Sequence, residues 1–271
     1  MTARRFPAPT VVLGSVMLGV PALVALVGPA LAGPVRSVAG PLEPPGAEFP
    51  LGTDVLGRDV LALALSGGTS IVVLAGLSLL LSYLVGVPLA LLVTSRHNRW
   101  ADGFLLRVMD FVLALPGLLV LLVLAATGWR GVATLVVAIA VLQLPAVVRI
   151  VRSAALAPGC RAAVEAMMMQ GEPWWRIHLG YVGRAVLGPV LVDAGNRLSL
   201  VLYLLASANF LGLGLAPSAS DWAVLVERNK EALFLQPLTV LVPAALLVAL
   251  CMGTNLLLDQ SLARRNGAAT A

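Results

Sequence analysis

Residues 71–93 read IVVLAGLSLLLSYLVGVPLALLV, a continuous apolar run without a charged side chain. A helix that crosses the hydrocarbon core of a bilayer needs about 20 such residues. The whole chain shares this bias, because 59% of its residues are hydrophobic and only 11% are charged, whereas soluble domains carry about 25% charged residues. This composition excludes a soluble globular domain and indicates a membrane protein.

Further charge-free windows lie on both sides of this run. The full set covers residues 6–35, 60–95, 111–129, 131–148, 198–220 and 232–258. The third and fourth windows are separated by residues 127–131, TGWRG, which predict a short turn between two helices. Several prolines lie inside or near the windows, and neighbouring helices accommodate the kinks that they cause. The sequence therefore predicts an all-α polytopic membrane protein with six transmembrane helices.

The arginines predict how these helices are oriented, because Lys and Arg are enriched in cytoplasmic loops. With the N-terminus in the cytoplasm, the inner side holds Arg4, Arg5, Arg96, Arg99, Arg107, Arg149, Arg152, Arg161, Arg176, Arg184, Arg264 and Arg265. The outer side then holds fewer cations, namely Arg36, Arg58, Arg130, Arg228 and Lys230. Both termini are therefore predicted to be cytoplasmic.

The first window has a second interpretation as a cleavable signal peptide. Arg4 and Arg5 precede an apolar run that ends at Ala30-Leu31-Ala32, which resembles a cleavage site. The run from Val11 to Ala32 is longer than the about 7–15 residues of a signal hydrophobic region. We therefore expect a retained helix, and cleavage would leave five spans with unchanged orientation.

The predicted outer loop, residues 33–69, contains a compact motif. Its members are Gly52, Thr53, Asp54, Gly57, Arg58 and Asp59. The glycines allow backbone turns that other residues resist, Asp54 is able to cap the amides that follow it, and Arg58 lies between two acids. The residues alone also fit a rigid surface turn held by local salt bridges.

The predicted cytoplasmic segment 149–184 has the pattern of two helices joined by a glycine turn. Pro158 and Gly159 open the first helix, and Gly171 suits the left-handed position after its end. Glu172-Pro173 suits the first turn of a second, short helix. Residues 167–169 are all Met and offer adaptable apolar surface to a partner. An amphipathic helix at the membrane surface, with Trp174 and Trp175 at the headgroups, is the alternative.

Two more features concern the fifth window. Asp193 and Arg197 lie four residues apart near its start, where they share a helix face and are able to pair. Ionisable groups at membrane depth are functional candidates, so the pair is a candidate for the substrate pathway, although an interfacial ion pair is the simpler interpretation. The loop after the window, residues 210–222, contains glycines and Pro217 that end a helix near the outer surface.

The sequence contains no pattern for catalysis or for metal binding. A nucleotide-binding Walker A motif requires Gly-Lys-Ser/Thr, and Lys230, the only lysine, follows Asn229 and precedes Glu231. His97 and His178 both fall in predicted cytoplasmic loops, and no H-E-x-x-H occurs. An intramembrane enzyme is therefore disfavoured. A stand-alone carrier or channel for a small solute stays open, although no inverted repeat supports it.

Four ordered motifs carry a family resemblance that covers most of residues 48–260. They are residues 50–60 of the outer loop, Arg107-Val-Met-Asp110 with Pro116, residues 210–222, and Asn255-Leu-Leu-Leu-Asp259. Together they resemble the C-type permease subunit of dipeptide/oligopeptide ABC transporters. The resemblance implies a type I ABC importer permease fold that moves peptides into the cell across the bacterial inner membrane.

The resemblance also implies partners and a docking segment. A second permease subunit, one or two cytoplasmic ATPase subunits that hold ATP and Mg, and an extracytoplasmic solute-binding protein are expected. No cofactor is expected in this chain. Residues 165–184 resemble the loop that docks on the ATPase, and the expected docking residues are Arg161, Glu165, Ala166, Met168, Gly171, Trp175 and Arg176. The expected organisation is residues 1–69 as first helix and outer loop, 70–260 as transmembrane domain with coupling segment 157–184, and 261–271 as cytoplasmic tail.

Overall fold

The computed structural model describes residues 8–33, 35, 39–95, 99–129, 131–216 and 219–268. Within these residues the chain is helical, and strand-like pairing is limited to one isolated bridge between Thr53 and Asp59. The α-helices are α1 (Ala8–Leu31), α2 (Val60–Ser66), α3 (Gly68–Ser95), α4 (Arg99–Ala114), α5 (Gly117–Ala126), α6 (Val132–Ala155), α7 (Pro158–Met169), α8 (Gly183–Phe210), α9 (Trp222–Asn229) and α10 (Leu238–Ala268). A π-helix, Arg176–Val182, leads into α8, and a 3-10 turn, Lys230–Ala232, follows α9. Residues 261–268 of the expected tail thus continue α10.

Within the described residues, five segments are long and apolar enough to cross a membrane, and a sixth crossing results if α4 and α5 form one broken span. The two parts of this broken span, Gly103–Ala114 and Gly117–Ala126, are bent by 78° at the break. The all-α class and the six transmembrane spans predicted from the sequence are confirmed.

The third span differs from its predicted window, residues 111–129. It begins earlier, at Gly103, and it is broken before Pro116. Proline lacks a backbone N–H and disfavours the helical conformation of the residue before it, here Leu115. The Leu115 amide closes α4 on the Val112 carbonyl at 3.2 Å, and α5 then starts in a new direction. The charge-free window missed the first half of this span because Arg107 and Asp110 lie inside it.

The fifth span also differs from its predicted window, residues 198–220. The helix begins far earlier, running without interruption from Arg176 to Phe210, and it ends before the loop that contains Gly212. Asp193 and Arg197 therefore lie within the helix rather than at its start. The two opposite charges pair with each other inside the helix. The charged residue Arg197 therefore does not bound the span, as the charge-free window had assumed.

The bundle core forms where α3, α6 and α8 pack together. Ile71, Ile139 and Leu205, one from each helix, are fully buried in it. A second apolar cluster lies nearer to α7 and includes Val148 of α6 and Cys160 of α7. The core therefore continues from the spans to the base of α7 and holds that helix against the bundle.

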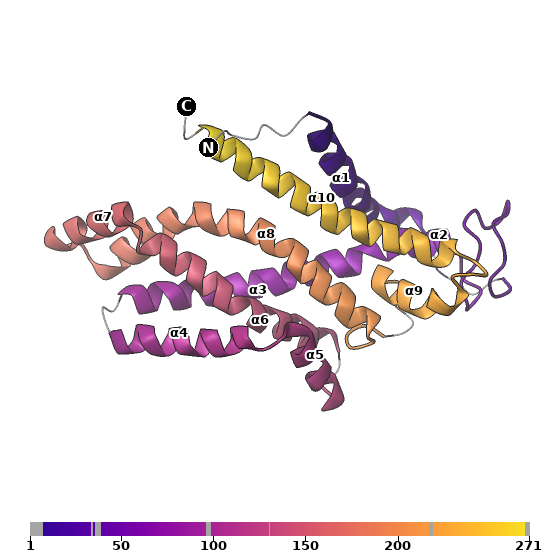
Figure 1. Ribbon diagram of the computed structural model, residues 1–271, viewed down its shortest axis with the longest axis horizontal. Coiled ribbons are helices and arrows are strands. Elements are labelled where there is room, and N and C mark those ends of the chain that lie inside the picture. The colour runs from indigo at the N-terminus through magenta and orange to yellow at the C-terminus, as the bar shows by residue number, and fades with distance from the viewer. Residues whose placement is uncertain are drawn as a thin grey trace.

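α1 and α10 pack side by side along one flank of the bundle (Figure 1). The two helices approach each other closely at Gly253 of α10. A Cβ atom at this position would lie 2.3 Å from the backbone nitrogen of Leu18 of α1. Glycine is therefore required at this crossing, as at other close helix contacts in membranes.

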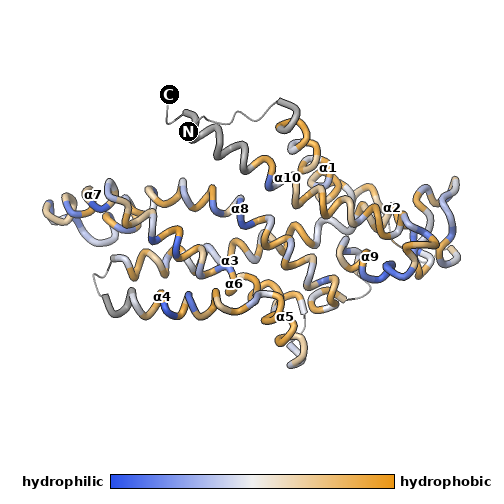
Figure 2. Tube along the Cα trace, viewed as in Figure 1, coloured by the Kyte–Doolittle hydropathy of each residue, from blue (hydrophilic) through white to orange (hydrophobic). Residues whose placement is uncertain are grey.

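The two ends of the bundle differ in structure. α7 lies at one end of the long axis, and α2, α9 and the loop formed by residues 39–59 lie at the other (Figure 1). Polar residues gather at these two ends, and apolar residues dominate the helices between them (Figure 2). This distribution is that of a protein whose middle part lies in hydrocarbon and whose ends reach water on opposite sides.

Candidate functional site

The turn after α7 has the geometry that its glycine predicted. Gly171 adopts a left-handed φ of 73°. Its amide bonds to the carbonyl of Met168 at 3.0 Å, and the amide of Glu172 bonds to the carbonyl of Met167 at 3.1 Å. These two bonds form a complete Schellman motif, which stops the helix and reverses the chain sharply. The predicted helix and glycine turn are confirmed.

The second helix predicted after Gly171 is present and begins at Trp174, directly after Glu172-Pro173, but the prediction that it is short is wrong. The chain instead enters the π-helix Arg176–Val182, which continues into α8 and reaches Phe210. Its anchoring side chains, Ile177, His178 and Val182, are buried. His178 is also fixed by stacking on Trp174, with ring centroids 5.2 Å apart. The turn at Gly171 is thus joined directly to a transmembrane helix.

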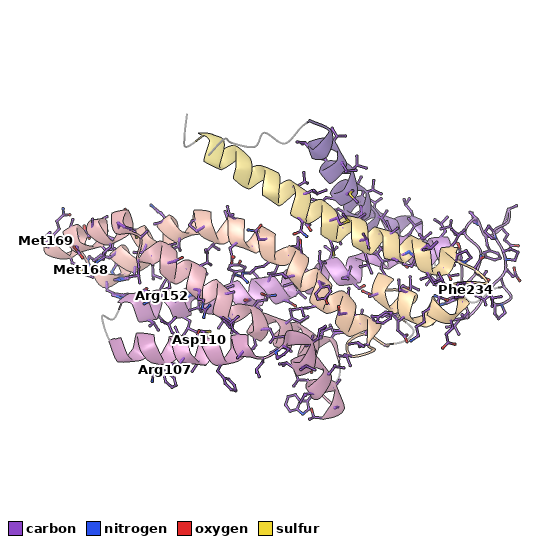
Figure 3. The ribbon with its side chains drawn as sticks, viewed as in Figure 1. Arg107, Asp110, Arg152, Met168, Met169 and Phe234 are labelled. Atoms are coloured by element: carbon purple, nitrogen blue, oxygen red, sulfur yellow. The ribbon has the colours of Figure 1, made fainter. Side chains whose placement is uncertain are left out.

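Four large apolar side chains project from this region and form what we call the docking tip: Met168, Met169, Trp174 and Trp175. Met169 is 84% exposed and Met168 is 51% exposed, and both lie at the extreme end of the molecule (Figure 3). Apolar side chains exposed at the polar end of a bundle favour contact with another surface.

Two ion pairs flank the docking tip. The Arg161 guanidinium donates to the Glu165 carboxylate at 2.9 Å along α7. Arg176 pairs with Glu172 at 2.9 Å across the start of the π-helix, and its guanidinium carbon lies 5.9 Å from the centre of the Trp175 ring. The predicted docking residues Arg161, Glu165, Met168, Gly171, Trp175 and Arg176 are therefore brought together at one end of the molecule, and Ala166 lies between them on α7.

At the opposite end, residues 39–59 with α2 and α9 form what we call the outer cap. Asp54 is fully buried, and its carboxylate accepts bonds from the Arg58 guanidinium at 2.6 and 2.8 Å. The same carboxylate accepts the backbone amides of Leu56 and Arg58, both at 2.9 Å. The structure therefore places Asp54 and Arg58 in the centre of a rigid turn rather than in an accessible site.

The rest of the predicted outer-loop motif serves the same turn. Gly52 and Gly57 have φ angles of 75° and 70°, which strongly favour glycine. The Thr53 hydroxyl donates to the carbonyl of Gly40 at 2.7 Å. Asp59 caps the start of α2 by accepting the amide of Leu61 at 2.9 Å.

Two residues that the sequence analysis missed tie the outer cap to distant parts of the chain. The Asn229 side chain at the end of α9 accepts the Val55 amide at 3.2 Å. The Gln236 side chain donates to the carbonyl of Glu43 at 3.1 Å and to that of Leu51 at 3.3 Å. Both residues are buried amides in the segment between α8 and α10, and nothing in the local sequence pattern indicated their partners.

The acid that precedes α9, Asp221, holds this helix in place. Asp221 caps α9 through the Ala223 amide at 2.9 Å and accepts the Ser70 hydroxyl of α3 at 2.6 Å. Burial raises the pKa of the Asp221 carboxyl, and these hydrogen bonds oppose that rise. Asp221, which belongs to the motif after the fifth span, therefore connects α9 to α3.

The predicted pair Asp193 and Arg197 forms a bidentate ion pair, with bonds of 2.6 and 3.0 Å. Tyr83 of α3 donates its hydroxyl to Asp193 at 2.7 Å, and Arg197 donates to the Gln143 side chain of α6 at 3.2 Å. Both charged side chains are only 13% exposed. The pair thus belongs to a polar cluster inside the junction of three helices, and its role in a substrate pathway stays a prediction.

The sequence of this chain is similar to those of known transport proteins. Residues 86–266 match the family of binding-protein-dependent transport system inner membrane components. A glutathione transport system permease protein of Pectobacterium atrosepticum is 29% identical over 80% of this chain and 72% of its own length. A probable peptide ABC transporter permease protein of Sinorhizobium fredii is 30% identical over 95% and 88%, respectively. A di/tripeptide transport system permease protein of Pseudomonas aeruginosa is 31% identical over 80% and 72%.

Proposed function

Since this chain belongs to the family of binding-protein-dependent transport system inner membrane components, we propose that it is one permease subunit of an ATP-driven importer of short peptides. The observation that carries the proposal is the family match, which covers four of the six spans and the docking tip. The names of three relatives, which refer to glutathione, peptide and di/tripeptide transport, support the substrate class. No feature of the chain favours a stand-alone carrier over this function.

The proposed complex contains a second permease subunit, one or two cytoplasmic ATPase subunits and an extracytoplasmic solute-binding protein. The chain itself is not an enzyme in this scheme, because ATP and Mg are held by the ATPase subunits. In this arrangement the docking tip faces the cytoplasm, the outer cap faces the solute-binding protein, and both termini are cytoplasmic. The separation of the tip and the cap at opposite ends of the bundle is consistent with this orientation (Figure 1).

Coupling in this scheme runs through the docking tip into α8. When the ATPase subunits close, they displace α7, and the Schellman turn at Gly171 transmits the displacement to the π-helix and then to α8. A helix from Arg176 to Phe210 contains 35 residues, which corresponds to about 50 Å at 1.5 Å per residue. A rigid element of this length is able to move both ends of the bundle together, as rigid-body switching requires.

The outer cap has a complementary role in the proposal. Its turn is fixed by the buried Asp54–Arg58 pair, and it is tied to α9 through Asn229. A rigid cap offers the solute-binding protein a surface of constant shape. The cap includes α9, which packs on α8. The cap therefore moves when the end of α8 moves.

The proposal is tested by purification of the chain with the products of neighbouring genes in mild detergent, followed by reconstitution in liposomes. We expect a second permease and at least one ATPase to co-purify, and peptide uptake to require ATP and a solute-binding protein. Uptake by this chain alone, without an ATPase, would establish the stand-alone carrier instead.

A further inference from the structure

An ion pair links α4 to α6 on the surface of the bundle. Asp110 of α4 accepts the guanidinium of Arg149 of α6. Their side chains are 57% and 53% exposed, respectively. This exposure contrasts with the Asp193–Arg197 pair, which is enclosed by three helices.

α4 presents different chemistry on different edges. Met109 is buried against the bundle. Phe104, Val108 and Phe111 form an exposed apolar edge. Asp110 is exposed on another edge, which continues to Ala114 because residues four apart share a helix face, and the exposed Arg107 lies between the two edges. α4 therefore meets two environments besides the bundle, one apolar and one polar.

The charged edge of α4 is exposed although it lies within a membrane span. Asp110 lies inside Gly103–Ala114, which is the first half of the broken span. Charged side chains within a span rarely face lipid and usually face a water-filled cavity or the bundle interior. The adjacent break at Leu115 and Pro116 has the same requirement, because irregular backbone at membrane depth needs water or protein around it. Lipid therefore suits the Phe104–Phe111 edge but not the charged edge.

Further arginines give this region a net positive charge. Arg149 and Arg152 come from one turn of α6, and Arg107 comes from α4. Arg107, Asp110 and Arg152 lie in the half of the molecule that ends at Met168 and Met169 (Figure 3). The charged edge thus belongs to the same end of the bundle as the docking tip.

We propose that the charged edge of α4, with Arg149 and Arg152 of α6, borders the water-filled cytoplasmic half of the translocation path. The ligand that it meets is the peptide in transit, whose carboxylate terminus suits the arginines and whose ammonium terminus suits Asp110. This inference rests on the proposed function and names the residues that the substrate passes. Because exposed ion pairs are weak, the Asp110–Arg149 pair is able to open and exchange partners with a passing peptide without trapping it.

The test uses single cysteines in the complete complex. Cys160 and Cys251 are first replaced by Ser, and peptide uptake by this cysteine-free complex is measured to check the proposed function independently. Ala114→Cys then places a thiol on the charged edge, while Val108→Cys places one on the apolar edge of the same helix. Inside-out membrane vesicles are treated with a membrane-impermeant thiol reagent, which needs a thiolate in water.

We expect the reagent to label Ala114→Cys and to leave Val108→Cys unlabelled, and we expect a transported peptide to slow the labelling at position 114. Three results would overturn the inference while leaving the importer function intact. They are no labelling at position 114 in a complex that transports, equal labelling at both positions, or labelling at position 114 that a transported peptide does not slow.

Discussion

The indole nitrogen of Trp222 donates a hydrogen bond to the backbone carbonyl of Ala64, 2.7 Å away, and so joins α9 to α2 across 158 residues of sequence. The Trp222→Phe variant keeps most of the ring but removes this donor, which leaves a buried carbonyl without its partner. We expect a loss of about 1–3 kcal/mol in the free energy of unfolding, measured on the purified protein in detergent. Trp129→Phe, which alters an exposed indole, is the control and should have no measurable effect.

Gly68 at the start of α3 lies directly against the same indole. A Cβ atom at this position would lie 2.5 Å from the Trp222 ring. We therefore expect Gly68→Ala to destabilise the protein by about 1–3 kcal/mol, as overpacking does. Gly76→Ala in the same helix meets no atom within 4 Å and should instead be neutral or stabilising, because alanine favours helix. Equal melting temperatures for the two variants would contradict the contact.

The docking tip predicts a charge-sensitive contact with an ATPase subunit. We expect Met169→Glu to reduce the amount of ATPase that co-purifies with the permease, because a charge would be buried at an apolar contact. Gln170→Glu adds the same charge at the next residue, which caps the end of α7, but it replaces a polar rather than an apolar side chain and should retain the ATPase. If both variants keep the ATPase, the tip is not the contact.

Substitutions at the Gly171 turn should uncouple peptide transport from the ATPase subunits without unfolding the protein. Proline fixes φ near −65° and lacks an N–H, whereas Gly171 has a φ of 73° and donates to Met168. Gly171→Pro should therefore abolish peptide uptake while the thermal stability of the spans is preserved. Glu165→Lys, which removes the partner of Arg161, should act in the same direction.

Gly159→Ala serves as a control for the turn, since its added methyl group meets no atom within 4 Å and its position is helical. This variant should transport normally. Normal uptake by Gly171→Pro would show that the turn does not transmit the displacement of α7.

The Asp193–Arg197 pair predicts non-additive stability effects. Arg197→Ala leaves the Asp193 charge enclosed without its main partner, and we expect a loss of about 3–5 kcal/mol. The double variant Asp193→Ala/Arg197→Ala removes both charges and should cost less than Arg197→Ala alone. Thermal melts in detergent of the double variant and of both single variants, Asp193→Ala and Arg197→Ala, check this, and additive losses would mean that the two side chains do not interact in the folded bundle.

The number and class of the helices were predictable from the sequence because a span needs a long apolar run, and such runs are local. The limits of two spans were not predictable from absent charges. Arg107 and Asp110 in the third span, and Asp193 and Arg197 in the fifth, are charges that the helices contain rather than charges that end them.

The glycine turn of the coupling segment was also predictable, because a left-handed residue after a helix is encoded locally by glycine. The partners of the polar cluster and of the outer cap were not. Tyr83 meets Asp193 across 110 residues, and Asn229 meets Val55 across 174. A buried polar side chain in an apolar span, such as Gln143, signals that a partner exists but does not identify it.

The break between α4 and α5 has a consequence for the life of the protein in the cell. Leu115 and Pro116 are exposed in the isolated subunit, and the first amides of α5 have no side-chain cap and no partner within their own helix. A newly inserted copy that has not met its second permease would present these groups to hydrocarbon, at a cost of several kcal/mol for each unpaired group. In the proposed complex the second permease would cover this break, so unassembled copies are expected to be degraded faster than assembled copies.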